Sequence, residues 1–419
     1  MVWSPATSKP VPPSGLVEAS REAALTGPAT VLNARTWAEV DLPALARNLR
    51  VVRDACGPDV AVMPVVKADA YGHGAVPVAW HLVREGIAML GVGDSTEALE
   101  LRAAGITAPI LVLGAVVDGE LPDVLRGGID LTIHSGDRVR RLRDTVRATQ
   151  RPVRVHLKVD TGMGRLGCHP ERAVEIAREV VDHEGLALAG IATHLASVTP
   201  DGGAPAEAQL ARFRQVVTEL ADVGIVPPWR HAHASGGILA ALTRDVNLVR
   251  PGIALYGVPP HPGSASGLER VLSWRTQIVF LKDHREGAAI GYEGTWTSSR
   301  RCRIATLPVG YNDGFRFALG NQAEVLVRGR RCPVVGRVSM DYVCVDVTDV
   351  PGAAVDDVVT LLGRDGDEEI TVEEMARLSG TIPHDVLCGI GRRVRRIYRG
   401  EAPATPAAMP MAPGTTSPR

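Results

Sequence analysis

The sequence lacks the features of a membrane, secreted or nucleic-acid-binding protein. Its 419 residues hold 46 Lys and Arg against 47 Asp and Glu, so no excess of one sign is present to attract nucleic acid or an anionic lipid surface. No apolar run approaches 18 residues, and no basic segment followed by an apolar one opens the chain, so neither a transmembrane helix nor a signal peptide is visible. We therefore expect a cytoplasmic protein without nucleic-acid or membrane partners.

Two residue types are informative because they are scarce or scattered. The six cysteines form no C-x-x-C pair and have no histidines spaced for zinc, so we expect reduced core thiols and no metal site. Lysine is nearly absent: Lys9, Lys67, Lys158 and Lys282 are the four present, and the other 42 basic residues are arginine. A lysine kept in an apolar segment is a candidate for chemistry that arginine cannot perform, because only an amine can lose its proton and attack a carbonyl.

The chain divides into segments of different composition. Residues 1–31 and 401–419 are rich in Pro, Ala, Ser and Thr without periodicity, which predicts disordered tails. Residues 32–43 predict a first strand that packs with a later β-domain. Residues 44–265 alternate short apolar runs with helical patterns. Eight of these runs are strand candidates, at 61–67, 89–93, 109–114, 130–134, 153–160, 188–194, 230–235 and 247–257.

This alternation of strand and helix patterns is typical of an α/β fold, specifically a (β/α)8 barrel, with a doubly wound sheet as the structural alternative. The helical patterns between the strands include 95–105, for which we expect a Ser95 cap, and 208–224. Over residues 266–400 the pattern changes to short β-branched runs separated by Gly, Asn-Asp and Pro-Gly turns. We expect a mostly antiparallel β-domain there.

The strongest local motif is VVKADAYGHG at 65–74, in which an apolar strand ends in Lys67. A strand-end lysine is commonly a surface residue whose stem lies along apolar neighbours. The apolar lead-in and the scarcity of lysine favour a Schiff-base lysine instead, since an amine becomes reactive when it is partly desolvated beside other cations.

Two glycine-containing loops predict a phosphate site in the same barrel mouth. Ala234 to Gly237 follow the seventh strand, and Arg250 to Ile253 lie in the eighth. The loops at these positions of a barrel commonly bind phosphate through backbone N–H groups, although a glycine pair alone is as often an ordinary turn. A phosphate beside a reactive lysine suggests pyridoxal 5'-phosphate.

Five motifs resemble the alanine racemase family, whose members are fold type III pyridoxal-phosphate enzymes. They are VVKADAYGHG, HLKVDTGMGRLG (156–167), NLVRPGIALYG (247–257), LPVGYNDG (307–314) and GRVSMD (336–341), in the family's order and spacing. The resemblance covers residues 34–400 and implies a pyridoxal-phosphate amino-acid racemase that works as a head-to-tail homodimer with shared active sites.

The resemblance also implies roles for catalytic residues. Lys67 is similar to the lysine that holds the cofactor and moves a proton on one face of the substrate α-carbon. Tyr292 resembles the base on the opposite face, which reaches the site from the second subunit's β-domain. Two bases on opposite faces invert the carbon without turning the substrate. A tyrosine is a weak base unless cations favour its phenolate. His194 resembles the histidine that hydrogen-bonds it.

Arg165 resembles the arginine near the cofactor's phenolic oxygen and the substrate carboxylate. His156, Lys158 and Asp160 are expected to share one face of a strand. Lys158 is similar to a lysine that is carbamylated in several family members, where the resulting anion orients the neighbouring arginine. Arg250 resembles the arginine that faces the pyridine nitrogen. A guanidinium there cannot accept the proton that would make the ring a strong electron sink, which limits transamination.

The remaining implied contacts are to the cofactor phosphate and to the substrate. The family predicts Tyr71, Ser235, Gly252 and Ile253 as cofactor-binding residues, and Met340, Asp341 and Tyr311 as substrate-binding residues. Two positions depart from the family pattern: Ala234 replaces an asparagine before the phosphate-binding serine, and Arg392 stands where some members have a tyrosine.

The resulting hypothesis is interconversion of L-alanine and D-alanine, which would supply D-alanine for peptidoglycan. A serine or broad-specificity racemase is the nearest alternative, because a pocket discriminates one methylene by only about 10- to 200-fold. A pyridoxal-phosphate decarboxylase is a further alternative, against which Arg250 and Tyr292 argue. A non-catalytic cofactor carrier would leave the β-domain without a purpose.

Overall fold

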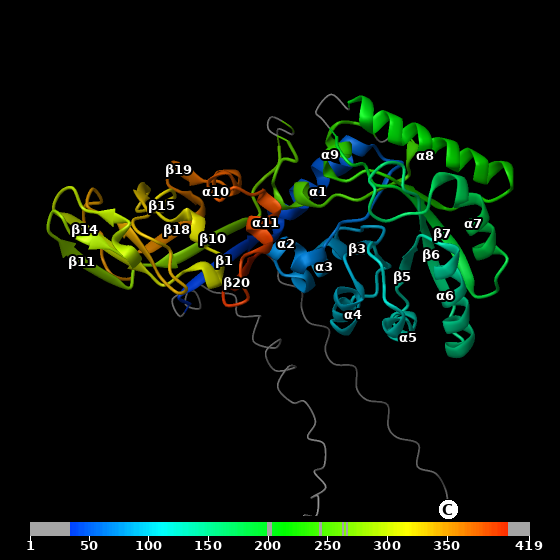
Figure 1. Cartoon of the computed structure of the whole chain (residues 1–419), viewed down its shortest axis with the longest axis horizontal. Helices are drawn as coiled ribbons and strands as arrows, with labels where there is room; N and C mark the ends of the chain where they lie inside the picture. The colour runs from blue at the N-terminus through cyan, green and yellow to red at the C-terminus, as the bar shows by residue number, and fades with distance from the viewer. Residues whose placement is uncertain (1–33, 199–202, 243–244, 262–263, 265–266, 401–419) are drawn as a thin grey trace, which may run out of the picture.

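The structure is a computed structural model that describes residues 34–198, 203–242, 245–261, 264 and 267–400. The predicted tails at 1–31 and 401–419 lie outside these residues. Within the described ranges, no helix combines the length and the hydropathy needed to cross a bilayer. The chain forms an elongated molecule, with the helices and parallel strands at one end and the mostly antiparallel strands at the other (Figure 1).

The first unit is a closed (β/α)8 barrel, which confirms the predicted fold class. Six strands form a parallel sheet in the order β3-β4-β5-β6-β7-β8, and β2 pairs with β9. The backbone closes the ring on both sides of this pair, through Gly91 N to Pro64 O at 2.9 Å and Arg250 N to His233 O at 2.9 Å. The strands are β2 (Ala61–Val62), β3 (Leu90–Val92), β4 (Ile110–Val112), β5 (Asp130–Ile133), β6 (Val153–Lys158), β7 (Leu186–Ala192), β8 (Trp229–His231) and β9 (Leu248–Val249).

Helices pack around the barrel and join its strands. Each buries an apolar face, as in α8, where Leu210, Phe213 and Leu220 are buried at helical spacing. The expected cap of α4 is wrong by one residue: Asp94, not Ser95, accepts the Glu97 N–H, because Asp94 is the residue with extended backbone. The helices are α1 (Leu42–Cys56), α2 (Lys67–Gly72), α3 (Ala75–Arg84), α4 (Ser95–Ala103), α5 (Leu121–Arg126), α6 (Gly136–Thr149), α7 (Ala173–Val181), α8 (Ala204–Asp222) and α9 (Ser235–Leu239), with 3-10 turns η2 (Asp118–Glu120), η3 (Pro170–Arg172) and η5 (Ile253–Tyr256).

The second unit is a β-domain built on one large sheet, in the order β16-β15-β18-β10-β1-β20 with β19 on β18. Smaller sheets are β11-β14-β17 and β12-β13. The pairs are antiparallel except β1 with β20. The strands are β1 (Thr36–Asp41), β10 (Leu272–Gln277), β11 (Phe280–His284), β12 (Ala289–Ile290), β13 (Trp296–Thr297), β14 (Cys302–Leu307), β15 (Glu324–Val327), β16 (Arg330–Pro333), β17 (Val343–Asp346), β18 (Val358–Asp365), β19 (Glu368–Ile370) and β20 (Arg395–Arg399), with helices α10 (Val372–Leu378) and α11 (Pro383–Cys388) and turns η6 (Tyr292–Gly294), η7 (Tyr311–Asp313) and η8 (Phe317–Leu319).

The first and last strands of the described chain join the two units. β1 lies between β10 and β20 in the large sheet, and its last residue, Asp41, caps the barrel helix α1. Side chains add further links, since Tyr398 donates to His73 O at 3.1 Å and Arg396 donates to Gly72 O at 3.0 Å. Because α2 holds Gly72, the β-domain fixes the segment that follows Lys67.

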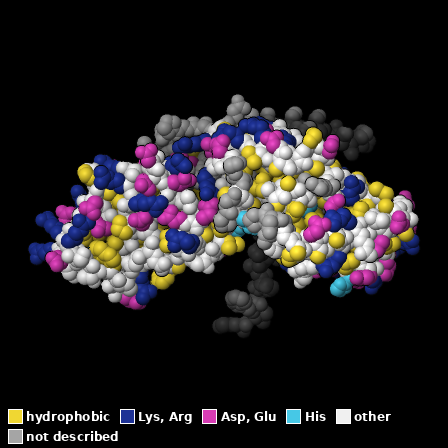
Figure 2. All heavy atoms as spheres, turned by 90° about the horizontal axis from the view of Figure 1, so that it is seen from above, with side chains coloured by type: hydrophobic (Ala, Val, Ile, Leu, Met, Phe, Trp, Pro, Cys, Tyr) yellow, Lys and Arg dark blue, Asp and Glu magenta, His cyan; other side chains and the backbone are white. Residues whose placement is uncertain are grey.

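Surface charge and thiols agree with most of the composition argument. Acidic and basic side chains are intermixed over the face seen in Figure 2, as the near-zero net charge predicts. Cys168, Cys302 and Cys332 are buried, and Cys56 and Cys344 are half-buried. The expectation of a core thiol is wrong for Cys388, which is exposed because α11 buries Val386 and Leu387 instead.

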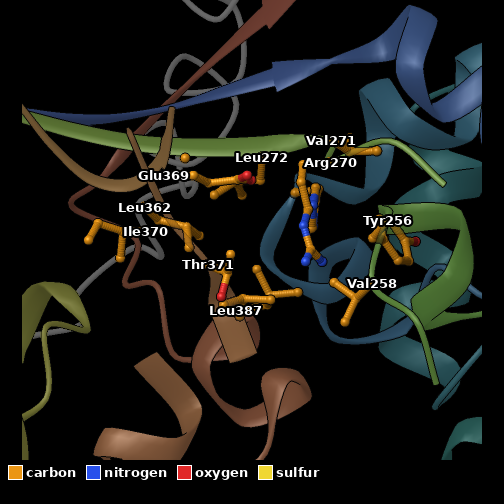
Figure 3. A pocket seen from close by; sticks show the side chains of 13 residues that line it. Tyr256, Val258, Arg270, Val271, Leu272, Leu362, Glu369, Ile370, Thr371 and Leu387 are labelled. Carbon is orange, nitrogen blue, oxygen red and sulfur yellow. The ribbon is translucent and has the colours of Figure 1, made fainter. Parts of the chain in front are cut away.

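A small cavity lies where the β-domain meets the barrel. Its volume is about 20 Å³, and Figure 3 shows Arg270 between Tyr256 and Thr371 on its walls. Arg270 is held by Gly257 O at 2.9 Å and by the Glu373 carboxylate at 2.8 Å. A space of this size holds one water molecule, so the cavity is too small for a substrate.

Candidate active site

A much larger cavity, of about 550 Å³, opens at the carboxyl ends of the barrel strands. This is the end at which barrel enzymes carry their active sites. The end of each barrel strand, or the segment that follows it, contributes to the walls, through Lys67, Gly93, Leu113, Thr132, Lys158, Thr193, Ala234 and Arg250.

The cavity is strongly cationic. Lys67, Lys158, Arg165 and Arg250 all line it, and its described lining residues include no Asp or Glu. Cations without carboxylate partners repel one another, so such a site favours anionic ligands. A phosphate and a carboxylate are ligands of this kind.

Lys67 begins α2 instead of ending a strand, which corrects the sequence expectation. The four residues after it, Ala68 to Tyr71, all have positive φ, between 52° and 55°, and form a left-handed turn. Such backbone costs about 1–2 kcal/mol per residue with a side chain. Glu97 and Asp69 hold the turn, since Ala68 N donates to Glu97 Oε1 at 2.6 Å and Ala75 N donates to Asp69 Oδ1 at 2.7 Å. The turn places Lys67 and Tyr71 on the same cavity.

Ser235, Gly252, Ile253 and Tyr71, which are expected to contact a phosphate, all line the cavity. Ser235 Oγ accepts the N–H groups of Gly252 at 3.0 Å and of Ala254 at 3.2 Å, which ties the two loops together. A Cβ on Gly252 would lie 2.4 Å from the Tyr71 hydroxyl, so only glycine fits there. This tight, glycine-dependent cradle fits a phosphate group, and Ala234 lines the cavity beside it.

Arg250 is buried at the base of the cavity and makes several hydrogen bonds. Its guanidinium donates to Thr193 O and Ala232 O at 2.8 Å, to His231 Nδ1 at 2.8 Å and to His194 Nδ1 at 3.2 Å. Burial lowers the pKa of Arg250 to about 10, so the side chain stays charged at neutral pH. Because a guanidinium only donates, both imidazole nitrogens facing it must be acceptors.

The two histidines bonded to Arg250 are neutral. Burial, followed by the charge of Arg250, lowers the pKa of His194 to about 3 and holds that of His231 well below its usual range. In a neutral ring that accepts at Nδ1, the proton is on Nε2. His194 therefore presents an Nε2–H donor.

Lys158 and Arg165 face the cavity from the end of β6 and from the loop after it. Burial, then the charges of Arg250 and Arg165, lower the pKa of Lys158 to about 8. About a tenth of this amine is then neutral at pH 7, which is the form that reacts with carbon dioxide.

Asp160 does not share the face of His156 and Lys158, which corrects a prediction. β6 ends at Lys158, and Asp160 lies in the next loop. Its carboxylate accepts the N–H groups of Gly162 and Met163, both at 2.9 Å, and of Gly164 at 3.1 Å. These bonds shape the loop that carries Arg165.

Five predicted or noted residues do not line this cavity. Tyr292, Tyr311 and Met340 are 70%, 44% and 53% exposed on the β-domain, and Asp341, which is half-buried, is paired with Arg393 at 2.8 Å. Arg392 is exposed as well. The β-domain strands β11 and β14 lie at the end of the molecule away from the barrel (Figure 1). One chain therefore holds the lysine side of the predicted site without Tyr292.

Sequence reasoning missed two contributions to the cavity. His384 reaches its rim from α11 and packs on Tyr71 with ring centroids 5.7 Å apart, a contact between segments more than 300 residues apart in the sequence that no local pattern signals. His231 also lines the cavity. Its place within the strand candidate at 230–235, three residues before Ala234, is the local signal that could have pointed to it.

Comparisons with known proteins agree with this geometry. The chain matches the family models "Alanine racemase, N-terminal domain" over residues 40–260 and "Alanine racemase, C-terminal domain" over residues 271–398. Alanine racemase from Symbiobacterium thermophilum is 44% identical over 368 residues, which cover 87% of this chain and 97% of the relative. Alanine racemase from Syntrophobacter fumaroxidans is 41% identical over 372 residues, which cover 88% of this chain and 99% of the relative.

Solved structures agree over the same span. Alanine racemase from Streptomyces coelicolor superposes with a TM-score of 0.84 at 33% identity, covering 89% of this chain and 100% of that one. Alanine racemase from Bartonella henselae, solved with covalently bound pyridoxal phosphate, superposes with a TM-score of 0.79 at 29% identity, covering 87% and 100%.

Proposed function

The chain belongs to the alanine racemase family, and from this premise we propose that it interconverts L-alanine and D-alanine with pyridoxal 5'-phosphate as cofactor. The observation that carries the proposal is the cavity in which Lys67, Arg250 and two further cations converge with no described acidic residue on its walls. Such a site suits a cofactor phosphate together with a substrate carboxylate.

The residues present fit the cofactor. Lys67 is the amine that would bind it covalently, the cradle of Ser235, Gly252 and Tyr71 would hold its phosphate, and Arg250 would face its ring nitrogen. When bound, pyridoxal phosphate makes the α-proton of an amino acid acidic by withdrawing electrons from the α-carbon. Arg250 stays charged at neutral pH, so it can donate a hydrogen bond to the ring nitrogen but cannot stabilise a protonated ring, which favours racemisation over transamination.

Two bases on opposite faces of the substrate would move the proton. Lys67 Nζ would exchange a proton with one face of the α-carbon. Tyr292 of a second copy would exchange a proton with the other face, since Tyr292 is 70% exposed and lies outside the cavity of its own chain. His194 would donate its Nε2–H to that phenolate, because its Nδ1 already accepts from Arg250. This arrangement requires a homodimer with shared active sites.

Arg165 would bind the substrate carboxylate, with Lys158 beside it. Carbamylation of Lys158 would convert one cation of the cavity into an anion that pairs with Arg165 and orients it. Met340, Asp341 and Tyr311 of the second copy would form the substrate entrance. We further propose that the enzyme acts in the cytoplasm and supplies D-alanine for peptidoglycan.

Chiral chromatography of L-alanine incubated with the cofactor-loaded protein tests the proposal. Racemisation to equal amounts of the two enantiomers is expected, together with incorporation of deuterium at the α-carbon in heavy water. The Lys67→Ala variant, which loses the amine, should show neither. Release of carbon dioxide without D-alanine would instead identify a decarboxylase, and faster turnover of L-serine than of L-alanine would identify a serine racemase.

A further inference from the structure

A line of buried polar groups runs from Arg250 through the barrel to its opposite end. His231 Nε2 lies 2.8 Å from His156 Nδ1, and His156 Nε2 lies 4.0 Å from the Asp130 carboxylate. Asp130, with its side chain 4% exposed, accepts from Arg154 Nε at 2.9 Å, and the Arg154 side chain is 52% exposed. Arg250 directly follows β9, and the other groups come from β8, β6 and β5, so the line joins the active-site cavity to solvent at the far end of the barrel.

The hydrogen bonds fix where each proton sits. Arg250 can only donate, so His231 accepts at Nδ1 and carries its proton on Nε2. That Nε2–H donates to His156 Nδ1, and the proton of His156 is therefore on its own Nε2. A proton on His156 Nδ1 would face the His231 Nε2–H at 2.8 Å, where two donors repel. The tautomers of the two rings are therefore coupled.

The end of the line has one charged partner. His156 is 0% exposed, and its Nε2 has no hydrogen-bond partner among the described residues. The nearest ionic group is the Asp130 carboxylate at 4.0 Å, which is too long for a hydrogen bond but close enough for the charge to stabilise an N–H dipole that points toward it. Burial lowers the pKa of His156 to about 3, so the ring stays neutral, with its proton on Nε2 and its acceptor at Nδ1.

We propose that Asp130 is a positioning residue for the reaction: its charge stabilises the Nε2–H of His156 and so supports, from the far end of the line, the pair of tautomers in which His231 Nδ1 is the acceptor for Arg250. The inference rests on the proposed function for the role of Arg250 at the cofactor ring, but the tautomer order does not depend on that role. Outer-shell partners of this kind orient functional side chains in many active sites. Asp130 touches neither the cavity nor its ligands, so its effect would be exerted only through the two histidines.

Imidazole 15N NMR of the full-length protein tests the tautomers without any substrate. The expected result is a neutral His231 and a neutral His156, each with an acceptor Nδ1 and a protonated Nε2, assigned with the His231→Gln and His156→Asn variants. A proton on Nδ1 of either ring would overturn the proposal. If this order is found but the protein forms no D-alanine, the relay stands and the proposed function fails.

The catalytic role is tested by the partition between racemisation and abortive transamination in the holoenzyme. Asp130→Leu removes the charge that faces the His156 Nε2–H, and it should raise transamination events per racemisation by about tenfold, the lower end of the loss seen for outer-shell partners of metal ligands. Asp130→Asn keeps the shape but removes the same charge and should raise the ratio to a similar extent, whereas Asp130→Glu keeps a carboxylate and should restore most of the wild-type partition. His233→Asn is the matched control, because His233 is a buried histidine of the same segment with no hydrogen bond from either ring nitrogen.

A role in stability alone predicts a different outcome. Asp130→Leu would then lower the melting temperature and the amount of active enzyme while leaving the partition unchanged, and that result would overturn the proposal. If Asp130→Leu fails to fold, the isosteric Asp130→Asn keeps the proposal testable, because it removes the same charge and must raise the same ratio.

Discussion

Mixing two inactive variants would show whether each active site is built from two chains. In a symmetric dimer with shared sites, one chain supplies Lys67 and the other supplies Tyr292. A Lys67→Ala chain paired with a Tyr292→Phe chain places both substitutions in one site and leaves the other site intact. Random pairing of equal amounts makes about half the dimers mixed, so about one quarter of all sites should be active.

The structure explains why the recovered activity should be easy to see. Tyr292 is 70% exposed and absent from the cavity that Lys67 lines. Loss of a general acid or base costs about 10²–10⁴-fold, so the mixture at a quarter of wild-type activity should exceed the Tyr292→Phe homodimer by at least about 25-fold. The assay is D-alanine formation after the two variants are denatured together and refolded, with differently tagged chains to measure the heterodimer fraction.

A matched control shows how much activity a mixed dimer with one intact site has. Refolding each variant with wild type should also give mixed dimers, each with one intact site. Heterodimers that form in the expected proportion but show no more activity than the separate variants would refute the shared site.

Four further outcomes follow from local features. Ala68→Gly should raise the melting temperature, because it removes the strain of an alanine with left-handed backbone, about 1–2 kcal/mol, which exceeds the entropic cost of glycine of about 0.5–1 kcal/mol. The control variant Ala103→Gly, at the end of α4, should lower the melting temperature instead. The free energy of unfolding should fall as pH drops from about 6.5 toward 4, because histidines that are buried and neutral in the fold become protonated when the chain unfolds; each contributes on the order of 1.4 kcal/mol per pH unit. The histidines whose pKa is lowered to about 3 or 4 are His73, His156, His194 and His233. Urea titrations at several pH values measure this loss of stability. In 13C-bicarbonate, a carbamate NMR signal is expected and should vanish in Lys158→Gln; an unchanged spectrum would exclude carbamylation of Lys158. Asp160→Ala should raise the KM for alanine by about tenfold through a loosened Arg165 loop, with kcat less affected and Asp160→Asn intermediate.

The sequence predicted the barrel well because its strands are buried on both sides. Such strands are continuous apolar runs that stand out from the amphipathic helices between them. All eight runs correspond to strands β2 to β9. Helix boundaries do not follow from the pattern in the same way: Asp94 and Ser95 are both good caps, and the extended backbone of Asp94 decides between them.

The candidate site was predictable where a motif is local and unpredictable where it depends on long-range contacts. Lys67, Arg165 and Arg250 each lie within a motif, and the cavity brings them together. The line from Arg250 to Asp130 depends on the neighbours that barrel closure provides, and His384 depends on the packing of α11 against the barrel. Neither leaves a pattern in a single segment.

The position of β1 has a consequence for how the chain acquires its structure. Its partners are residues 272–277 and 395–399, so β1, the first strand of the described residues, stays unpaired until nearly all of those residues have been synthesised. Contacts this distant in sequence form slowly and leave an unpaired edge exposed in the meantime. Completion of the large sheet is therefore a late event in biogenesis, and a chain truncated before residue 395 would retain an open edge at β1 through which copies could aggregate.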